Sequence, residues 1–169
     1  MTEVVYQDES AIRSVVERFE SCDYALDEFT HARHLTVACW CLCTMPPEEA
    51  LTRMRAGLMQ FIAHHRRHGY HETITRFWVE LLGDFLGGLP SGTSLVQKTN
   101  RAVQRFGSKD LLFAYYTRER VMSDTARREW VQPDLKSITG AQALPSGCLK
   151  SSDSRSESGS RLAGGPSGA

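Results

Sequence analysis

The sequence lacks any apolar run long enough to cross a membrane. No stretch approaches the ~20 apolar residues that a transmembrane helix requires. The opening residues, MTEVVYQDES, are acidic and polar, whereas a secretory leader has basic residues followed by an apolar segment. We therefore expect neither membrane insertion nor secretion.

Cysteine is present but in a pattern that does not suit disulfides. The chain has five cysteines, an odd number, and Cys39, Cys41 and Cys43 crowd into one apolar segment. A framework of paired disulfides is therefore a poor interpretation, and we expect a reducing, cytoplasmic environment. Because helical residues step by about 100°, this spacing points the three thiols to different sides. They are predicted to act as small apolar side chains.

The chain has no excess of charge of either sign, with 20 basic and 20 acidic residues. Its adjacent arginine pairs, at 66–67 and 127–128, are scattered among acidic residues. Without a zinc-finger, basic-region or RNA-binding aromatic pattern, the sequence argues against nucleic-acid binding. Residues 1–30 carry a net charge of −6 and residues 31–139 one of +5. We expect these two parts to attract each other.

Short catalytic motifs are also missing. There is no glycine-rich phosphate loop, no nucleophile elbow and no pair of histidines four apart with a glutamate after the first. A functional site must therefore be inferred from the residues that share a helix face.

Apolar residues recur at intervals of three and four along most of the chain, and no strand-like alternation is long enough to build a sheet. The pattern predicts an all-α, bundle-like array of about six helices. The expected helices cover roughly residues 8–21, 31–44, 47–69, 71–85, 93–107 and 109–121, with a short last helix in DTARREWV.

Local signals set several of these boundaries. Thr30 suits the N-cap of the second helix, because its hydroxyl can accept a hydrogen bond from a free backbone N–H. Pro46 disfavours helical geometry in the residue before it, and Gly69 is a good stop for the third helix. From residue 140 the composition changes to Ser, Gly, Ala and Pro. We therefore predict one domain over 1–139 and a disordered Ser/Gly-rich tail over 140–169.

Histidines at helix ends form the main candidate site. His31 and His34 share one face of the second helix, and His71 begins the fourth helix with Glu72 beside it. Short connections on both sides of the third helix predict an up-down-up arrangement that brings these ends together. Neutral imidazoles with a carboxylate are a ligand set for zinc or iron. We expect His31, His34, His71 and Glu72 as the metal ligands.

Helix lengths weigh against this convergence. If the second and third helices are aligned at Pro46, His31 falls ~12 Å short of His71, at 1.5 Å per residue. The third helix must then end early or cross at a steep angle. The competing interpretation is that these three histidines are satisfied by hydrogen bonds in the core. The other histidines, at 64, 65 and 68, suit a helix C-terminus.

A metal-free site at the same place is a second interpretation. Two helix N-termini offer free N–H groups, and Arg76 could add a bidentate cation for a carboxylate or a phosphate. Tyr70 could supply a hydrogen-bonding or acid–base group. The simpler role for Arg76 is an ion pair with Glu72 or Glu80 on a solvated helix face.

Three segments, FTHARHLTVACWCL, YHETITRFWVEL and ARREWVQPDL, carry a resemblance. Over residues 20–136 the chain resembles a family of small helical bacterial proteins with no established activity. That family shares a His-x-x-His pair, a Tyr-His-Glu-Thr element and a closing Val-x-Pro-Asp element. The resemblance places these landmarks on His31, His34, Tyr70, His71, Glu72, Thr73, Arg76, Pro133 and Asp134.

Two hypotheses about function follow. In the first, the protein binds a small molecule or a metal at the His/Glu site, with or without catalysis. In the second, it is a non-catalytic interaction or regulatory module whose histidines only cap and pack. The second hypothesis expects exposed apolar surface on the first or last helix.

Overall fold

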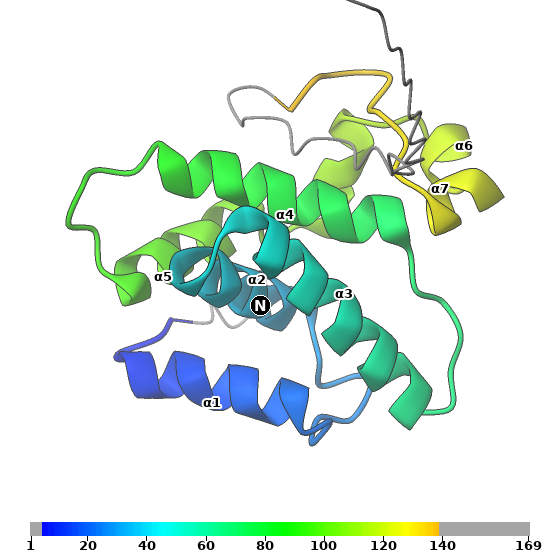
Figure 1. Cartoon of the computed structure of the whole chain (residues 1–169). Helices are drawn as coiled ribbons and strands as arrows, with labels where there is room; N and C mark the ends of the chain where they lie inside the picture. The colour runs from blue at the N-terminus through cyan, green and yellow to red at the C-terminus, as the bar shows by residue number, and fades with distance from the viewer. Residues whose placement is uncertain (1–4, 139–169) are drawn as a thin grey trace, which may run out of the picture.

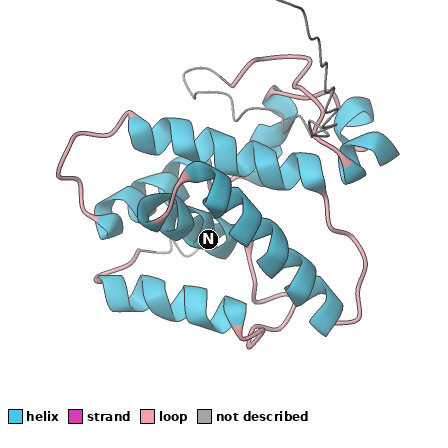
Figure 2. Cartoon of the chain, in the orientation of Figure 1, coloured by secondary structure: helices cyan, strands magenta, loops and turns pink. Residues whose placement is uncertain are grey.

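The computed structural model describes residues 5–138, and this part of the chain is helical with no strand (Figure 2). The prediction of an all-α, bundle-like fold is confirmed. The predicted tail over 140–169 lies outside the described residues. The elements in order are α1 (Glu9–Glu20), α2 (His31–Thr44), α3 (Pro47–His64), α4 (Glu72–Gly87), α5 (Leu95–Phe106), the 3-10 helix η1 (Lys109–Ala114), α6 (Arg118–Val121) and α7 (Asp124–Arg128).

Helix α2 is the centre of the molecule. It packs against α1, α3, α4 and α5, and its middle turns are buried from Leu35 to Cys39. The short helices α6 and α7 lie together at one end of α4 (Figure 1), where α7 packs against it. A helix surrounded on most sides must be apolar on most faces. This explains why α2 reads as a nearly continuous apolar segment.

Helix α3 ends at His64, earlier than the predicted stop at Gly69. Arg66 adopts a left-handed conformation with φ of 52°, and its N–H donates to the Ala63 carbonyl at 2.9 Å. The N–H of Arg67 donates to the Ile62 carbonyl at 3.0 Å. These two bonds form a Schellman motif. The early end shortens the helix by about 7 Å, which favours the convergence that the sequence left in doubt.

The predicted single helix over 109–121 is wrong, because the chain breaks after η1 and restarts as α6. Tyr116 is fully buried at the break, and its hydroxyl donates to the Val131 carbonyl at 2.9 Å. Asp134 accepts hydrogen bonds from both the N–H and the hydroxyl of Thr117, at 2.9 and 2.6 Å. These long-range bonds outweigh the local helical preference.

Hydroxyl residues precede the helices α2, α5 and α7. Thr30 is the N-cap of α2, yet its side chain makes no capping hydrogen bond. Ser94 caps α5 in a reciprocal capping box with Gln97. Ser123 caps α7, which is shorter than predicted because the chain leaves helical geometry at Glu129.

None of the helices between residues 5 and 138 combines the length and the apolar character needed to span a membrane. The thiols of α2 lie mostly inside the fold, with Cys39 and Cys41 buried and Cys43 half-buried. Burial raises the pKa of the Cys41 thiol to about 11. These thiols are therefore protonated at neutral pH and poor nucleophiles.

Candidate functional site

A cavity of about 240 Å³ lies where α2, α3 and α4 meet. It brings together four of the predicted site residues: His31, His34, Tyr70 and His71. The rest of the lining is mostly apolar and comes from the inward faces of the three helices and from the connection before α4. These residues are Leu35, Ala38, Met54, Leu58, Ile62, Gly69, Ile74, Thr75, Trp78 and Val79.

Among the three imidazoles that line the cavity, His34 is the one with neither ring nitrogen hydrogen-bonded within the described chain. Its ring is half-buried and packs on Phe29, with ring centroids 4.2 Å apart. No hydrogen bond joins the ring to any protein group between residues 5 and 138. Burial, with a smaller contribution from nearby His31, lowers the pKa of His34 to about 4. The ring is therefore neutral at neutral pH and offers one donor and one acceptor.

One ring nitrogen of His31 makes a hydrogen bond within the protein. Its Nε2 donates to the carbonyl of Phe106, the last residue of α5, at 3.0 Å. Its ring meets Trp78 edge-on, with centroids 4.6 Å apart. Burial lowers the pKa of His31, which favours the neutral ring. Because Nε2 must carry the proton in this bond, Nδ1 is the nitrogen left as an acceptor.

Both ring nitrogens of His71 make hydrogen bonds within the protein. It lies just before α4 as its N-cap, and its Nδ1 accepts from the Ile74 N–H at 3.3 Å. Its Nε2 donates to the carbonyl of Val121, the last residue of α6, at 2.8 Å. Both ring nitrogens are thus used by the protein. Burial lowers the pKa of His71, consistent with a neutral capping imidazole.

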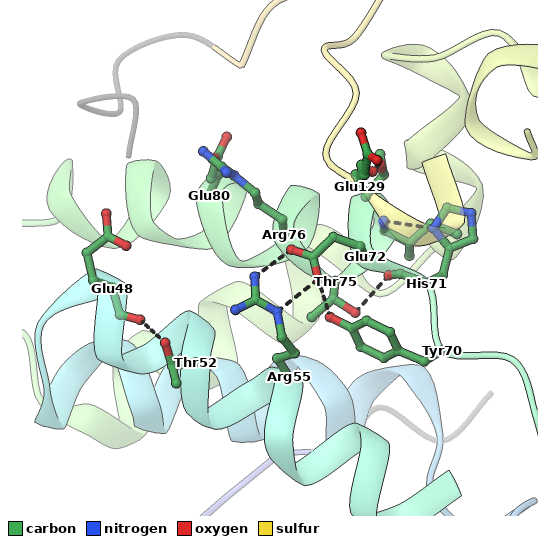
Figure 3. A network of polar contacts seen from close by, with 12 residues as sticks. Glu48, Thr52, Arg55, Tyr70, His71, Glu72, Thr75, Arg76, Glu80 and Glu129 are labelled. Atoms are coloured by element: carbon green, nitrogen blue, oxygen red, sulfur yellow. Dashed lines mark hydrogen bonds and ion pairs between the residues drawn. The ribbon is translucent and has the colours of Figure 1, made fainter. Parts of the chain in front are cut away.

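Glu72 does not line the cavity, and its carboxylate bonds with Arg55 and Tyr70 (Figure 3). Arg55 of α3 donates to its two oxygens, from Nε at 2.9 Å and from an η nitrogen at 2.5 Å. The Tyr70 hydroxyl donates to the same carboxylate at 2.7 Å. Burial would raise the pKa of Glu72, but these hydrogen bonds outweigh it and lower the pKa. Glu72 is an ionised partner of Arg55.

Arg76 also lies outside the cavity, in a surface groove that Arg55 and Glu72 share. Its Nε donates to Glu80 at 2.6 Å, and its guanidinium lies 4.8 Å from the centre of the Trp130 ring. The expected i, i+4 partner is therefore correct. The expected solvated face is not, because the two side chains are only 14% and 12% exposed.

The four expected metal ligands do not assemble. Over the described part of the chain, no three His, Cys, Asp or Glu side chains are placed to hold a metal ion. The hydrogen bonds explain why, since His71 uses both nitrogens on the backbone and Glu72 pairs with Arg55. A ligating imidazole needs a free nitrogen lone pair. Neither zinc nor iron is supported by this geometry.

Arg55 is the residue that the sequence did not indicate. It lies on α3 between Met54 and Leu58, which both line the cavity, so a basic residue at the edge of an apolar stripe was the available signal. Nothing in the sequence pairs it with a carboxylate 17 residues later. The histidines at 64, 65 and 68 do not line the cavity.

The resemblance to a family of small helical bacterial proteins stays a prediction. No protein-family model, curated protein or solved structure matches the chain.

Proposed function

We propose that this protein binds a small molecule in the cavity between α2, α3 and α4. The observation that carries the proposal is the meeting of four predicted site residues, from α2 and from the segment before α4, around one largely apolar hollow. Ligand sites in proteins are typically concave and apolar with a few placed polar groups. The half-buried, hydrogen-bond-free ring of His34 is such a group.

The size of the cavity limits the ligand. An apolar cavity of roughly 150 Å³ can hold a benzene molecule, and drug-sized ligands occupy pockets of roughly 300–1,000 Å³. At about 240 Å³, this cavity suits one ring with a small substituent, or an aliphatic chain of similar volume.

An interaction module is the second candidate. It is favoured by the structural use of His31 and His71, which each donate to the carbonyl of the last residue of another helix. An interaction module was expected to expose apolar surface on its first or last helix, and this surface is not found there between residues 5 and 138. Within the described chain, neither α1 nor α7 carries an exposed large apolar side chain.

The proposal is tested by titrating 15N-labelled protein with toluene and with phenol and following the amide resonances. We expect saturable shifts in residues that line the cavity. Leu58→Trp, which puts a larger side chain on the cavity wall, should abolish them. Leu86→Trp is the matched control, because Leu86 is also partly buried but does not line the cavity. If neither compound gives saturable shifts in the wild type, or if both tryptophan variants bind as it does, the proposal is wrong.

A further inference from the structure

Most polar groups around the cavity are used by the protein itself, and within the described chain the exceptions are the His34 ring, Nδ1 of His31 and the indole N–H of Trp78. Thr75 donates its hydroxyl proton to the carbonyl of His71 at 3.0 Å, and Tyr70 donates to a carboxylate outside the cavity. His31 and His71 donate their Nε2 protons to backbone carbonyls. His34 is the one lining residue that can still offer a donor and an acceptor together.

The lining also has no permanent charge. None of its fourteen residues, all in the described chain, is Lys, Arg, Asp or Glu. The carboxylate of Glu72, which follows the lining residue His71 in the chain, is already paired with Arg55 and Tyr70 (Figure 3). An ionised ligand would lose its hydration without gaining a counter-ion, which is costly. The lowered pKa of His34, about 4, means that this imidazole does not supply a positive charge at neutral pH.

We infer that the ligand is an uncharged molecule about the size of one substituted ring, carrying a hydroxyl group that hydrogen-bonds with His34. A hydroxyl both donates and accepts, so it matches either nitrogen of a neutral imidazole. The apolar body of the ligand replaces water along the faces of α2, α3 and α4. This inference rests on the proposed function, since it specifies the ligand of the same cavity.

Three probes of similar size separate the features of such a ligand. Phenol carries the hydroxyl, toluene replaces it with a methyl group, and benzoate carries a charge at neutral pH. We expect phenol to bind two- to tenfold more tightly than toluene, the range of roughly 0.5–1.5 kcal/mol that one hydrogen bond contributes. Benzoate should bind at least tenfold more weakly than phenol. Dissociation constants would come from amide shifts at pH 7.

His34→Phe tests the role assigned to the imidazole. The variant keeps an aromatic ring beside Phe29 but removes both nitrogens, so phenol should lose its advantage while toluene binds as before. His64→Phe is the matched control, because His64 is exposed at the end of α3 and does not line the cavity. It should leave the ratio of phenol to toluene affinities unchanged.

The outcomes separate this inference from the proposed function. Equal binding of phenol and toluene, or an advantage for phenol that survives in His34→Phe, overturns the hydroxyl and its contact with His34 but leaves a small-molecule site. Benzoate binding as tightly as phenol overturns the uncharged ligand. If the wild type binds none of the three probes, toluene included, the proposed function itself is wrong.

Discussion

His34 is a neutral imidazole inside the fold, and its protonation opposes folding. Its pKa in the folded protein is about 4, below the ordinary value of 6.5. The unfolded chain therefore binds the proton more readily, and stability falls as the pH drops from 6.5 toward 4. We predict that His34 accounts for a loss of up to about 3 kcal/mol in the free energy of unfolding over this range.

The measurement is urea unfolding of the wild type and His34→Phe at pH 7, 6, 5 and 4. The difference between the two proteins isolates His34, because the carboxylates and the other histidines are common to both. The wild type should lose more stability than the variant on acidification. Parallel curves would show that the His34 ring is hydrated well enough to keep its ordinary pKa.

The ion pair of Arg55 with Glu72 should contribute more than an exposed pair of the same type. The Arg55 and Glu72 side chains are 35% and 12% exposed, and two hydrogen bonds join them. Arg53 and Glu20, which link α3 to α1, are 45% and 39% exposed. In double-mutant cycles with Arg→Met and Glu→Gln, we predict a coupling of roughly 1–3 kcal/mol for the first pair. The second should give about 0.2–1 kcal/mol.

Each cycle needs four free energies of unfolding, from chemical denaturation at low and at high salt. Salt should weaken the Arg53–Glu20 coupling more, because exposed charges are better screened. Equal couplings in the two cycles would contradict the view that partial burial strengthens the Arg55–Glu72 pair.

At the scale of the helix, alanine substitutions at two glycines test side-chain packing and helix propensity separately. Gly57 on α3 lies against Phe19, and a Cβ there would come within 2.6 Å of the ring. Gly83 on α4 has space, with its nearest neighbour at 3.8 Å. Alanine favours a helix interior over glycine by roughly 0.5–1 kcal/mol. Gly83→Ala should therefore stabilise the protein by about that amount.

Gly57→Ala should destabilise it, because the buried Phe19 ring must move, and overpacking costs roughly 1–3 kcal/mol. Thermal unfolding of the two variants and the wild type checks both signs. Stabilisation by Gly57→Ala would mean that α1 can shift away from α3 at little cost.

Helix faces could be predicted from the sequence because they depend on local periodicity. The spacing of His31 and His34 placed both on one face, and the structure puts both at the cavity. The partners of these residues could not be predicted in the same way. His71 bonds to Val121, fifty residues later, and that carbonyl is available because α6 ends at Val121. Such pairings arise from tertiary packing, which no local pattern encodes.

At the scale of the whole molecule, hydrogen bonds join the segment after α7 to the start of α4. The C-terminal segment after α7 returns to α4, where Thr73 is fully buried. Its hydroxyl donates to the Glu129 carbonyl at 2.7 Å and accepts from the Val131 N–H at 3.1 Å. One side chain thus satisfies two backbone groups more than fifty residues away. Thr73 lies in the first turn of α4, two residues after the cavity-lining residue His71.

Thr73→Val keeps the shape of the side chain but removes both bonds, leaving two backbone groups without their partner. We predict a loss of about 2–6 kcal/mol, at roughly 1–3 kcal/mol for each of the two unsatisfied groups. Thr52→Val is the matched control, because the exposed Thr52 hydroxyl bonds only within its own helix, to the Glu48 carbonyl (Figure 3). Amide hydrogen exchange should show faster opening in residues 117–138 for Thr73→Val alone. If exchange instead accelerates equally in all helices, the C-terminal segment unfolds only together with the rest of the protein.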